Sequence, residues 1–217
     1  MRNKLFYRHI IISFFALFLF SNKVWSANEK CKFTGLQSTI KFGYVIPFQN
    51  TFREEYKQQL FIGNTAVPVS IGFASQFAFH KGFGFRVGCD MAQFRATNGP
   101  ITLSMIDATV GPTYSKQFGP SGKFRATASI GLGPSWALAK SEYKEYLSTT
   151  SYQTVQETIV YRSICTQMEA DMQYNIKECF NLGTYIAFYR KKYDSSNQGG
   201  FGILSGTKIG LHFTITK

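Results

Sequence analysis

The last segment of the chain has the most restrictive pattern in the sequence, because its apolar and polar residues alternate without interruption. Residues 208–215 read K-I-G-L-H-F-T-I, with apolar side chains at the odd positions and Lys, Gly, His and Thr at the even ones. Successive side chains of a β-strand point to opposite faces. The segment therefore predicts a strand with one apolar face and one polar face.

Seven earlier segments share this alternation, which is least regular in the fourth. The predicted strands are 36–46, 67–79, 83–91, 101–114, 124–136, 159–174, 180–188 and 208–215. The connections between them alternate between short turns and long polar segments, the long ones being 49–64, 140–158 and 191–199. About eight antiparallel strands joined in this way predict an up-and-down β-barrel.

Composition helps to decide which face of the barrel points inward. Aromatic residues make up 17% of the chain, with 22 Phe and 12 Tyr, and only 17% of residues are charged. A soluble sandwich or lipocalin-like barrel would bury the apolar face and show the polar face to water. Here the polar face mixes charges with Gly and Ser, which suits a small hydrogen-bonded lumen. We favour an all-β, antiparallel transmembrane barrel, with the soluble barrel as the alternative.

The first 26 residues have the features of a cleaved signal peptide. Arg2, Lys4 and Arg8 precede an apolar run at 10–20, and a cut before Ala27 is predicted. The run is shorter than the roughly 20 apolar residues that span a bilayer, although an uncleaved anchor is an alternative. We expect a signal peptide at 1–26 and a barrel domain at 27–217. The net charge of the whole chain is +12, and the domain stays basic.

Four positions of the closing segment form a known signal. Gly210 stands two positions after Lys208, and hydrophobic or aromatic residues occupy the sixth and eighth positions of the segment, Phe213 and Ile215. In this respect the segment resembles the closing strand of small bacterial outer-membrane β-barrel proteins, such as the OmpA-type transmembrane domain and the opacity-type surface proteins. The resemblance implies a monomer in the outer membrane of a Gram-negative cell, inserted there by the barrel insertion machinery.

The same resemblance implies a function. In such families the barrel is a scaffold for long outer loops, so we expect a structural or surface-interaction, adhesin-like role through loops 49–64 and 140–158. The expected partners are outer-membrane lipid, lipopolysaccharide and a host or surface ligand. A small-solute pore and a lipid-modifying enzyme are the alternatives. The sequence has no phosphate-binding Gly-rich loop, metal-ligand cluster or nucleic-acid motif, so we expect no cofactor, metal or nucleic acid.

A set of polar residues falls on the predicted interior face. Its members are Lys41, Arg86, Asp90, Arg125, Glu169, Asp171, Lys208 and His212. A barrel of about eight strands is only wide enough for its own side chains to fill. We therefore predict a polar network that closes the lumen. The alternative is a pore in which Lys41 or Arg86 sets selectivity.

Four cations occupy the alternate positions of their strands, which face lipid, near the outward ends of these strands. They are Lys140, Arg162, Arg190 and Lys192. A three-residue turn before the seventh strand sets Arg162 opposite Arg190, and a five-residue turn sets it opposite Lys192. Two cations side by side are unfavourable unless an anion lies between them. Our hypothesis is that these residues contact lipopolysaccharide phosphates. The alternative is that they only extend into the headgroup zone.

His212 and the cysteines are the candidate reactive groups of the predicted barrel. His212 can meet Glu169 or Asp171 across the lumen, but no serine stands in a nucleophile context, so we predict no catalytic residue. Export permits disulfides among Cys31, Cys89, Cys165 and Cys179, and four cysteines allow three pairings. Parity places Cys89 toward lipid and Cys165 in the lumen. The pairing that we consider is Cys31 with Cys179, because the last strand lies between their strands.

Overall fold

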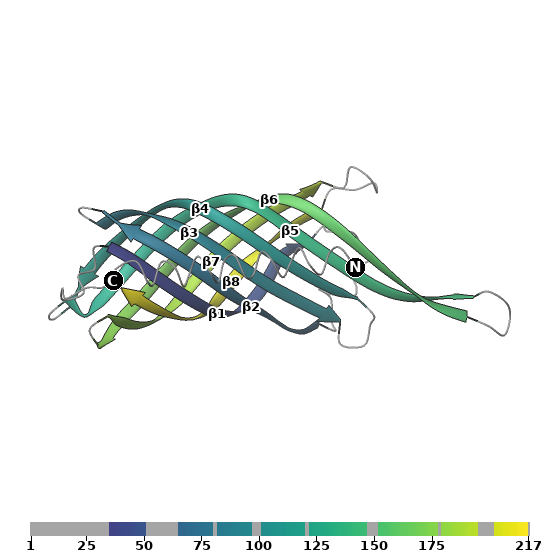
Figure 1. Ribbon diagram of the computed structural model, residues 1–217, viewed down its shortest axis with the longest axis horizontal. Helices are drawn as coiled ribbons and strands as arrows, with labels where there is room; N and C mark the ends of the chain where they lie inside the picture. Colours follow the sequence, from purple (N-terminus) through teal and green to yellow (C-terminus); the bar gives the residue numbers. More distant parts are fainter. Residues whose placement is uncertain are drawn as a thin grey trace.

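The part of the chain that the structure, a computed structural model, describes consists of residues 35–50, 65–79, 82–96, 101–119, 122–146, 152–177, 179–194 and 202–216. Its strands are β1 (Gly35–Asn50), β2 (Thr65–Ala78), β3 (Phe83–Ala96), β4 (Thr102–Phe118), β5 (Phe124–Tyr146), β6 (Tyr152–Lys177), β7 (Phe180–Asp194) and β8 (Gly202–Thr216). Each strand pairs antiparallel with the next, and β8 pairs with β1 to close the ring (Figure 1). The predicted fold, an up-and-down barrel of eight strands, is confirmed. The predicted signal peptide, loop 49–64 beyond β1, and Cys31 lie outside the described residues.

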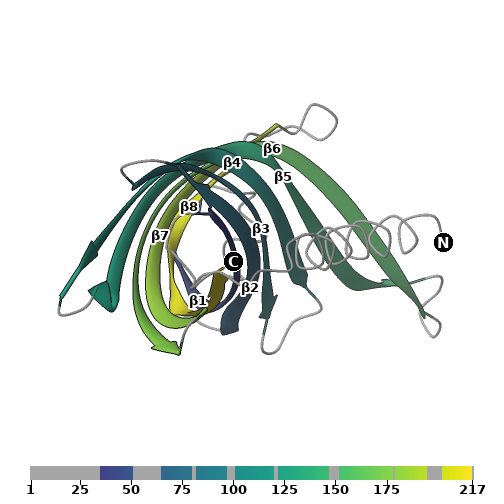
Figure 2. The same cartoon turned by 60° about the vertical axis from the view of Figure 1, so that its left-hand side comes forward.

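The two ends of the barrel differ. At one end β1 begins, β8 ends, and β2, β4 and β6 turn directly into the next strand; we call this the turn end. Gly82, Gly119 and Gly122 stand there with positive φ, a conformation that Gly adopts without steric cost in tight turns. At the other end, the hairpin end, β5 and β6 extend past their neighbours, and Figure 2 shows them leaving the ring of strands as a two-stranded arm.

Several strands are longer than the alternation predicted. β5 has 23 residues and β6 has 26, so that residues 140–146 and 152–158 are paired strand, and the prediction of a polar loop over 140–158 is wrong in this part. β7 likewise runs to Asp194, through part of the segment predicted as the loop 191–199. The polar residues of these segments remain in the ladder because backbone hydrogen bonds, not burial of an apolar face, hold them there.

The side chains are distributed in the reverse of a soluble protein. Phe48 and Ile164 on the outer face are 63% and 65% exposed, whereas Lys41 and Lys208 on the inner face are each 1% exposed. Apolar side chains outside and charged side chains inside are stable only where the surroundings are apolar, so the wall faces lipid. Within the described residues, no helix is long and apolar enough to cross a membrane.

Aromatic rings surround the turn end of the wall. Phe118 stacks on Phe124 at 5.8 Å between ring centroids, and Phe124 meets Tyr174 at 5.1 Å. Around the next strands, Phe180 lies 6.0 Å from Phe213. These cross-strand contacts form the girdle that anchors a membrane barrel at the interface, and Phe213 of the closing segment is part of it.

The interior has three layers. Toward the hairpin end lies an apolar cluster, made of Val45, Ala92, Phe94, Ile101, Leu103, Met105, Ala137, Ala139, Tyr161, Cys165, Tyr189, Tyr193 and Leu204. The middle layer is charged. Toward the turn end lie buried amides and hydroxyls, among them Gln37, Thr39, Gln76, Thr113, Thr127, Gln173, Asn181, Thr214 and Thr216. Buried side chains thus line the described lumen in all three layers.

Candidate functional site

A series of buried ion pairs with alternating sign crosses the middle of the lumen. Arg86 of β3 donates to a Glu169 carboxylate oxygen of β6 at 2.6 Å, and Lys41 of β1 lies 3.0 Å from the other oxygen. Lys41 also lies 2.9 Å from Asp90 of β3. Gln167 donates to both carboxylates, at 3.1 Å to Asp90 and 3.0 Å to Glu169. Glu169 therefore has three hydrogen-bond donors, and Asp90 shares two of them and has a third, Lys208, as a buried carboxylate requires.

The series continues through β8 to β4 and β7. Asp90 and Asp107 stand directly opposite each other on β3 and β4, an arrangement that would be repulsive by itself. Lys208 lies between them, with its Nζ 3.2 Å from Asp90 and 3.3 Å from Asp107. Lys191 ends the series 2.6 Å from Asp107, which also accepts a hydrogen bond from Ser135 at 2.7 Å. Seven charges from six strands are thus joined into one network.

Small residues on the lumen face make room for these long side chains. A Cβ added at Gly72 of β2 would collide with the Asp90 carboxylate and lie 2.8 Å from Cε of Lys41. A Cβ at Gly183 of β7 would likewise collide with the ring of His212. The Gly residues interleaved with charges in the sequence thus have a steric role, because a narrow barrel has no spare volume beside a buried ion pair.

The remaining predicted lumen residues lie nearer the turn end. Arg125 donates to Gln173 at 2.7 Å, and Gln173 donates to Asp171 at 3.0 Å, so the two charges are joined through an amide. His212 has its Nδ1 3.4 Å from the Thr214 hydroxyl. Among the described side chains no hydrogen bond joins His212 to Glu169 or Asp171, so the acid–histidine meeting considered for an enzyme is not formed.

Sequence reasoning missed two members of the network, Asp107 and Lys191. Lys191 was assigned to a loop, yet it is fully buried, with Nζ 5.0 Å from the centre of the Tyr189 ring. The alternation of Tyr185, Tyr189 and Tyr193 with outward residues continues through Lys191 and would have placed it inside. Asp107 lies in the predicted strand with the least regular pattern, which had no assigned parity.

The chemistry of the lumen is that of a closed structural network. The apolar cluster lies toward the hairpin end of the lumen, and each of the seven charges has a partner at 2.6–3.3 Å. Lys41 and Arg86, to which the pore alternative assigns selectivity, both belong to this network. They also contain no group of His, Cys, Asp and Glu side chains that could hold a metal ion.

The register of the outward cations differs from the prediction. Arg162 pairs with Asp194, not with Arg190 or Lys192, and the predicted opposition of two cations is therefore wrong. The connection between β6 and β7 is shorter than either turn considered, and a register shift follows Asn175. The contact with lipopolysaccharide was inferred from that opposition, so it needs a different argument.

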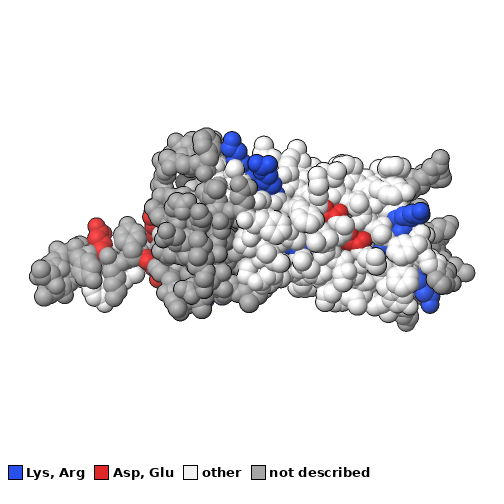
Figure 3. All heavy atoms as spheres, turned by 180° about the vertical axis from the view of Figure 1, so that it is seen from behind, with Lys and Arg blue, Asp and Glu red and all other residues white. Residues whose placement is uncertain are grey.

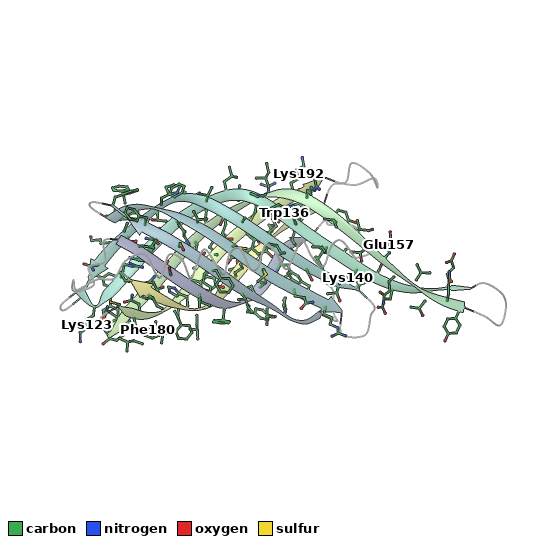
Figure 4. All side chains as sticks on the ribbon, viewed as in Figure 1. Lys123, Trp136, Lys140, Glu157, Phe180 and Lys192 are labelled. Carbon is green, nitrogen blue, oxygen red and sulfur yellow. The ribbon has the colours of Figure 1, made fainter. Side chains whose placement is uncertain are left out.

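The cations nevertheless gather on one part of the outer face. Lys192 pairs with Ile164, two residues along β6 from Arg162, so the two cations are diagonal neighbours with Cα atoms about 7–8 Å apart. Lys140 stands apart, because it pairs with Thr158, four residues beyond Arg162. Figure 4 shows Lys140 displaced toward the hairpin from Lys192.

The arm formed by β5 and β6 is the most exposed part of the described chain. β4 pairs with β5 no further than Lys140, and β7 pairs with β6 no further than Arg162, whereas β5 and β6 pair with each other up to Tyr146 and Tyr152. Six residues past Lys140 correspond to about 20 Å at the rise of a strand. Both outer edges of the arm have no neighbour among the described strands.

The cysteines divide into a bonded one and two free ones. Cys179, beside the start of β7, is disulfide-bonded, and its predicted partner Cys31 lies outside the described residues. Cys165 is a free thiol inside the apolar cluster of the lumen. Cys89 is also free; it has the outward parity predicted for it but is only 5% exposed.

Comparison with known proteins supports the fold. No protein-family model and no curated protein sequence matches the chain. The structure of neisserial surface protein A superposes with a TM-score of 0.51 and 11% sequence identity, over 85% of this chain and 98% of that one. Ail of Yersinia pestis, in complex with the heparin analogue sucrose octasulfate, gives 0.47 and 13%, over 84% and 100%. OprG of Pseudomonas aeruginosa gives 0.43 and 9%, over 85% and 98%.

The likeness to neisserial surface protein A is one of fold alone, since so few residues are identical. Together with the closed ring of eight strands and the apolar outer wall, it shows that the chain has the fold of the small outer-membrane β-barrels. This is the class that the closing segment, with Lys208 turned into the lumen and Ile215 exposed on the wall, predicted.

Proposed function

We propose that this protein is an outer-membrane barrel whose function is contact at the cell surface, made by the β5–β6 arm. The observation that carries the proposal is the contrast between a lumen whose seven central charges are paired with one another and an arm of paired strands that reaches about 20 Å past the ring. Lys41 and Arg86, the residues of the pore alternative, are engaged in ion pairs. The arm offers two exposed faces and two strand edges to a partner.

The side chains of the arm suit recognition. Tyr152 at the tip is 54% exposed, and Gln153 and Gln156 are exposed beside it. Tyr supplies a large contact area with little conformational entropy to lose, and amides adapt their hydrogen bonds to a partner. Gln153 donates to Glu145 at 3.1 Å and Gln156 donates to Glu142 at 2.6 Å across the arm.

The proposed partner is a ligand on another surface, such as a host cell. The arm points to the outside of the cell in this proposal. The tight turns, the start of β1 and the end of β8 all lie at the other end of the barrel, and short turns face the periplasm in outer-membrane barrels. Lipid and the barrel insertion machinery are the partners proposed for the wall and for the closing segment.

The test is a barrel with a shortened arm. Residues 143–155 are replaced by Asn-Gly, so that a type I′ turn joins Glu142 to Gln156 and preserves their pairing. Cells that display the wild-type barrel should adhere to cultured host cells, and cells that display the shortened barrel should lose that adhesion. The Lys116→Gln variant, which changes an exposed residue near the turn end and leaves the arm intact, is the control for expression. Heat-modifiable migration on gels should be the same for all three.

Adhesion that survives the shortening, with the folded band present, would show that the arm is not the contact surface. Adhesion lost together with the folded band would report misfolding. In that case a smaller change, the replacement of residues 146–152 by Asn-Gly, is the measurement that decides, because a type I′ turn then joins Glu145 to Gln153 and leaves that pair in place.

A further inference from the structure

One side of β6 has no described strand beside it along residues 152–161. β7 pairs with β6 no further than Arg162, and among the described strands only β5 continues beside β6 beyond that residue. The backbone N–H and C=O groups along an unpaired strand side are a template on which another strand can pair. We call residues 152–161 on this side of the arm the β6 edge.

The direction of the backbone groups shows which residues form this edge. Asn175 of β6 donates its backbone N–H toward β5, to Lys123, at 2.8 Å. Residues that bond to one neighbour alternate along an antiparallel strand with residues that face the other side. β5 and β6 pair without a register shift up to Tyr146 and Tyr152, so the odd residues of β6 bond to β5. The even residues, from Tyr152 to Val160, direct their N–H and C=O groups to the β6 edge.

The two edges of the arm differ in composition. The β6 edge reads Y-Q-T-V-Q-E-T-I-V-Y, with Glu157 as its single charged residue and without Lys, Pro or Gly. The opposite edge, residues 141–146 of β5, reads S-E-Y-K-E-Y, and half of it is charged. Charged residues, Lys above all, and Pro prevent pairing at an edge, whereas β-branched residues favour it. The β6 edge is therefore the edge that suits a further strand.

The sequence of the β6 edge limits how a second copy of the same edge could pair with it. In an antiparallel pair of two copies, even residues stand opposite even residues. Two such registers overlap all but one residue of the edge, one centred on Gln156 and the other on Glu157. Figure 3 shows acidic residues, in red, on the projecting arm. The register centred on Glu157 sets two acids directly opposite each other, which is unfavourable.

The register centred on Gln156 gives favourable pairs throughout the edge. Gln156 stands opposite Gln156 of the second copy, Thr154 opposite Thr158, and Tyr152 opposite Val160. All of these residues are exposed. Paired hydroxyls and an aromatic ring beside a β-branched side chain are stabilising cross-strand contacts, and paired amides hydrogen-bond to each other. The β6 edge is thus complementary to itself.

The position of β7 determines from where the second copy can approach. Within the ring, β7 lies directly beside β6 up to the pair of Arg162 with Asp194. Two barrels in one membrane hold their rings at the same height, so β6 of the second barrel would need the place that β7 already occupies. A barrel in an opposed membrane brings only its arm into the space beyond β7, and this arm runs antiparallel to the first.

We propose that the β6 edge binds the β6 edge of a second copy of this protein on an opposed membrane, so that the two arms form one sheet that joins two cells. The proposal rests on the outward orientation of the arm in the proposed function, and it leaves the tip and faces of the arm to a host ligand. Residues 152–160 of the two copies would form about ten backbone hydrogen bonds. Such a contact is smaller than the interface of a stable dimer, so its strength comes from many copies on each membrane.

The experiment uses phosphatidylcholine vesicles that contain the purified barrel, with aggregation followed by light scattering. Thr158→Pro removes an N–H group from the β6 edge and leaves the bonds to β5 in place, because the N–H of Thr158 points away from β5. Thr158→Ala, which keeps the N–H group, is the matched control. Wild-type and Thr158→Ala vesicles should aggregate. Thr158→Pro should slow aggregation roughly tenfold or more, because each symmetric pair of arms loses two hydrogen bonds.

A charge exchange tests whether the partner is the same edge in the expected register. Thr154→Lys/Thr158→Lys and Thr154→Glu/Thr158→Glu each set like charges opposite each other when a copy meets itself. Vesicles that contain either variant alone should stay dispersed. A mixture of the two should aggregate, because Lys then stands opposite Glu at both positions. The migration of each variant on gels, boiled and unboiled, shows that the barrel is folded.

Three results would overturn the proposal. Wild-type vesicles that stay dispersed would show that a second copy does not bind the edge. Aggregation of Thr158→Pro vesicles at the wild-type rate would show that the contact lies elsewhere. A mixture of the Lys and Glu variants that stays dispersed would exclude the self-complementary register. If Thr158→Pro does not give the heat-modifiable folded form, Thr154→Pro tests the same edge nearer the tip, and its aggregation at the wild-type rate would overturn the proposal equally.

Failure of this proposal is distinguishable from failure of the proposed function. The vesicles contain no host ligand, so their aggregation reports only contact between copies of the barrel. Host-cell adhesion of the Thr158→Pro variant should stay at the wild-type level, because the tip and the faces of the arm are unchanged. Host adhesion that survives shortening of the arm, together with vesicle aggregation that is lost, would overturn the proposed host contact and support the pairing of β6 edges.

Discussion

The lumen and the β5–β6 arm both contain charged residues and glutamines, yet these groups do opposite things in the two regions. In the lumen, Lys41 and Asp90 are 1% and 5% exposed, and each makes several short polar contacts. On the arm, Glu142 and Gln156 are exposed and are joined to each other by a cross-strand hydrogen bond. Burial makes the lumen groups indispensable to one another, whereas water can replace any partner on the arm.

The difference separates stability from recognition. If the stability of a barrel depended on its arm, the amino-acid sequence of the arm could not change freely. If the lumen were open, its charges would be exposed to solutes. Here the middle of the barrel holds the fold together, and the arm is available to a partner. Substitutions in the lumen should therefore change the free energy of unfolding, and substitutions on the arm should leave it nearly unchanged.

The largest effect is expected from Asp90→Ala. Its carboxylate is shared by Lys41 at 2.9 Å and Lys208 at 3.2 Å, so its loss leaves two buried cations short of an anion. Breaking a buried ion pair on one side costs about 3–5 kcal/mol. The urea midpoint of the barrel in lipid vesicles, followed by the fluorescence of Trp136, should fall accordingly.

Glu145→Ala on the arm is the control for the same measurement. It also removes an acid with a hydrogen-bond partner, Gln153 at 3.1 Å, but an exposed one. Its free energy of unfolding should stay within about 0.5 kcal/mol of the wild-type value. Equal shifts for Asp90→Ala and Glu145→Ala would erase the distinction between the two regions.

A smaller effect is expected from adding one methyl group to the lumen. Gly72→Ala places a Cβ against the Asp90 carboxylate and 2.8 Å from Cε of Lys41, so the network must shift. Overpacking of this kind costs about 1–3 kcal/mol. Gly88→Ala is the matched control on the neighbouring strand, because the nearest atom to its Cβ is Oγ1 of Thr109 at 3.4 Å. Gly88→Ala should be neutral or slightly stabilising, and a loss as large as that of Gly72→Ala would mean that space beside Asp90 is not what the glycine provides.

Much of this division could be predicted from the sequence because a strand has a period of two. Alternation alone placed Lys41, Glu169 and Lys208 inside and Ile215 outside, and all four lie there. The period reports which face a residue is on. It does not report which residue of another strand it meets, since that depends on register.

Register and strand length account for the failures. The pairing of Arg162 with Asp194 depends on the connection after β6, whose length the polar residues around it did not define. Lys191 was not predicted as a lumen residue because adjacent Lys residues resemble a loop, although the alternation continues through them. Asp107 was not predicted as a lumen residue because the neighbouring Ala108 is small. A small residue weakens the apolar face by which the inward and outward sides of a strand are told apart.

The smallest effect on stability is expected from Gln156→Ala, in the arm. The substitution removes the 2.6 Å hydrogen bond to Glu142, an exposed cross-strand contact worth roughly 0.2–1 kcal/mol where it forms. Because the arm pairs only with itself beyond Lys140, this loss should remain local. The urea midpoint should not move. Amide exchange at residues 141–142 should become faster than in the wild-type protein, while exchange in the part of β5 within the ring should keep its wild-type rate. A midpoint shift as large as that of Gly72→Ala would show that the arm unfolds together with the barrel. In that case the arm would be part of the structural unit, and its sequence could not change independently to suit a partner.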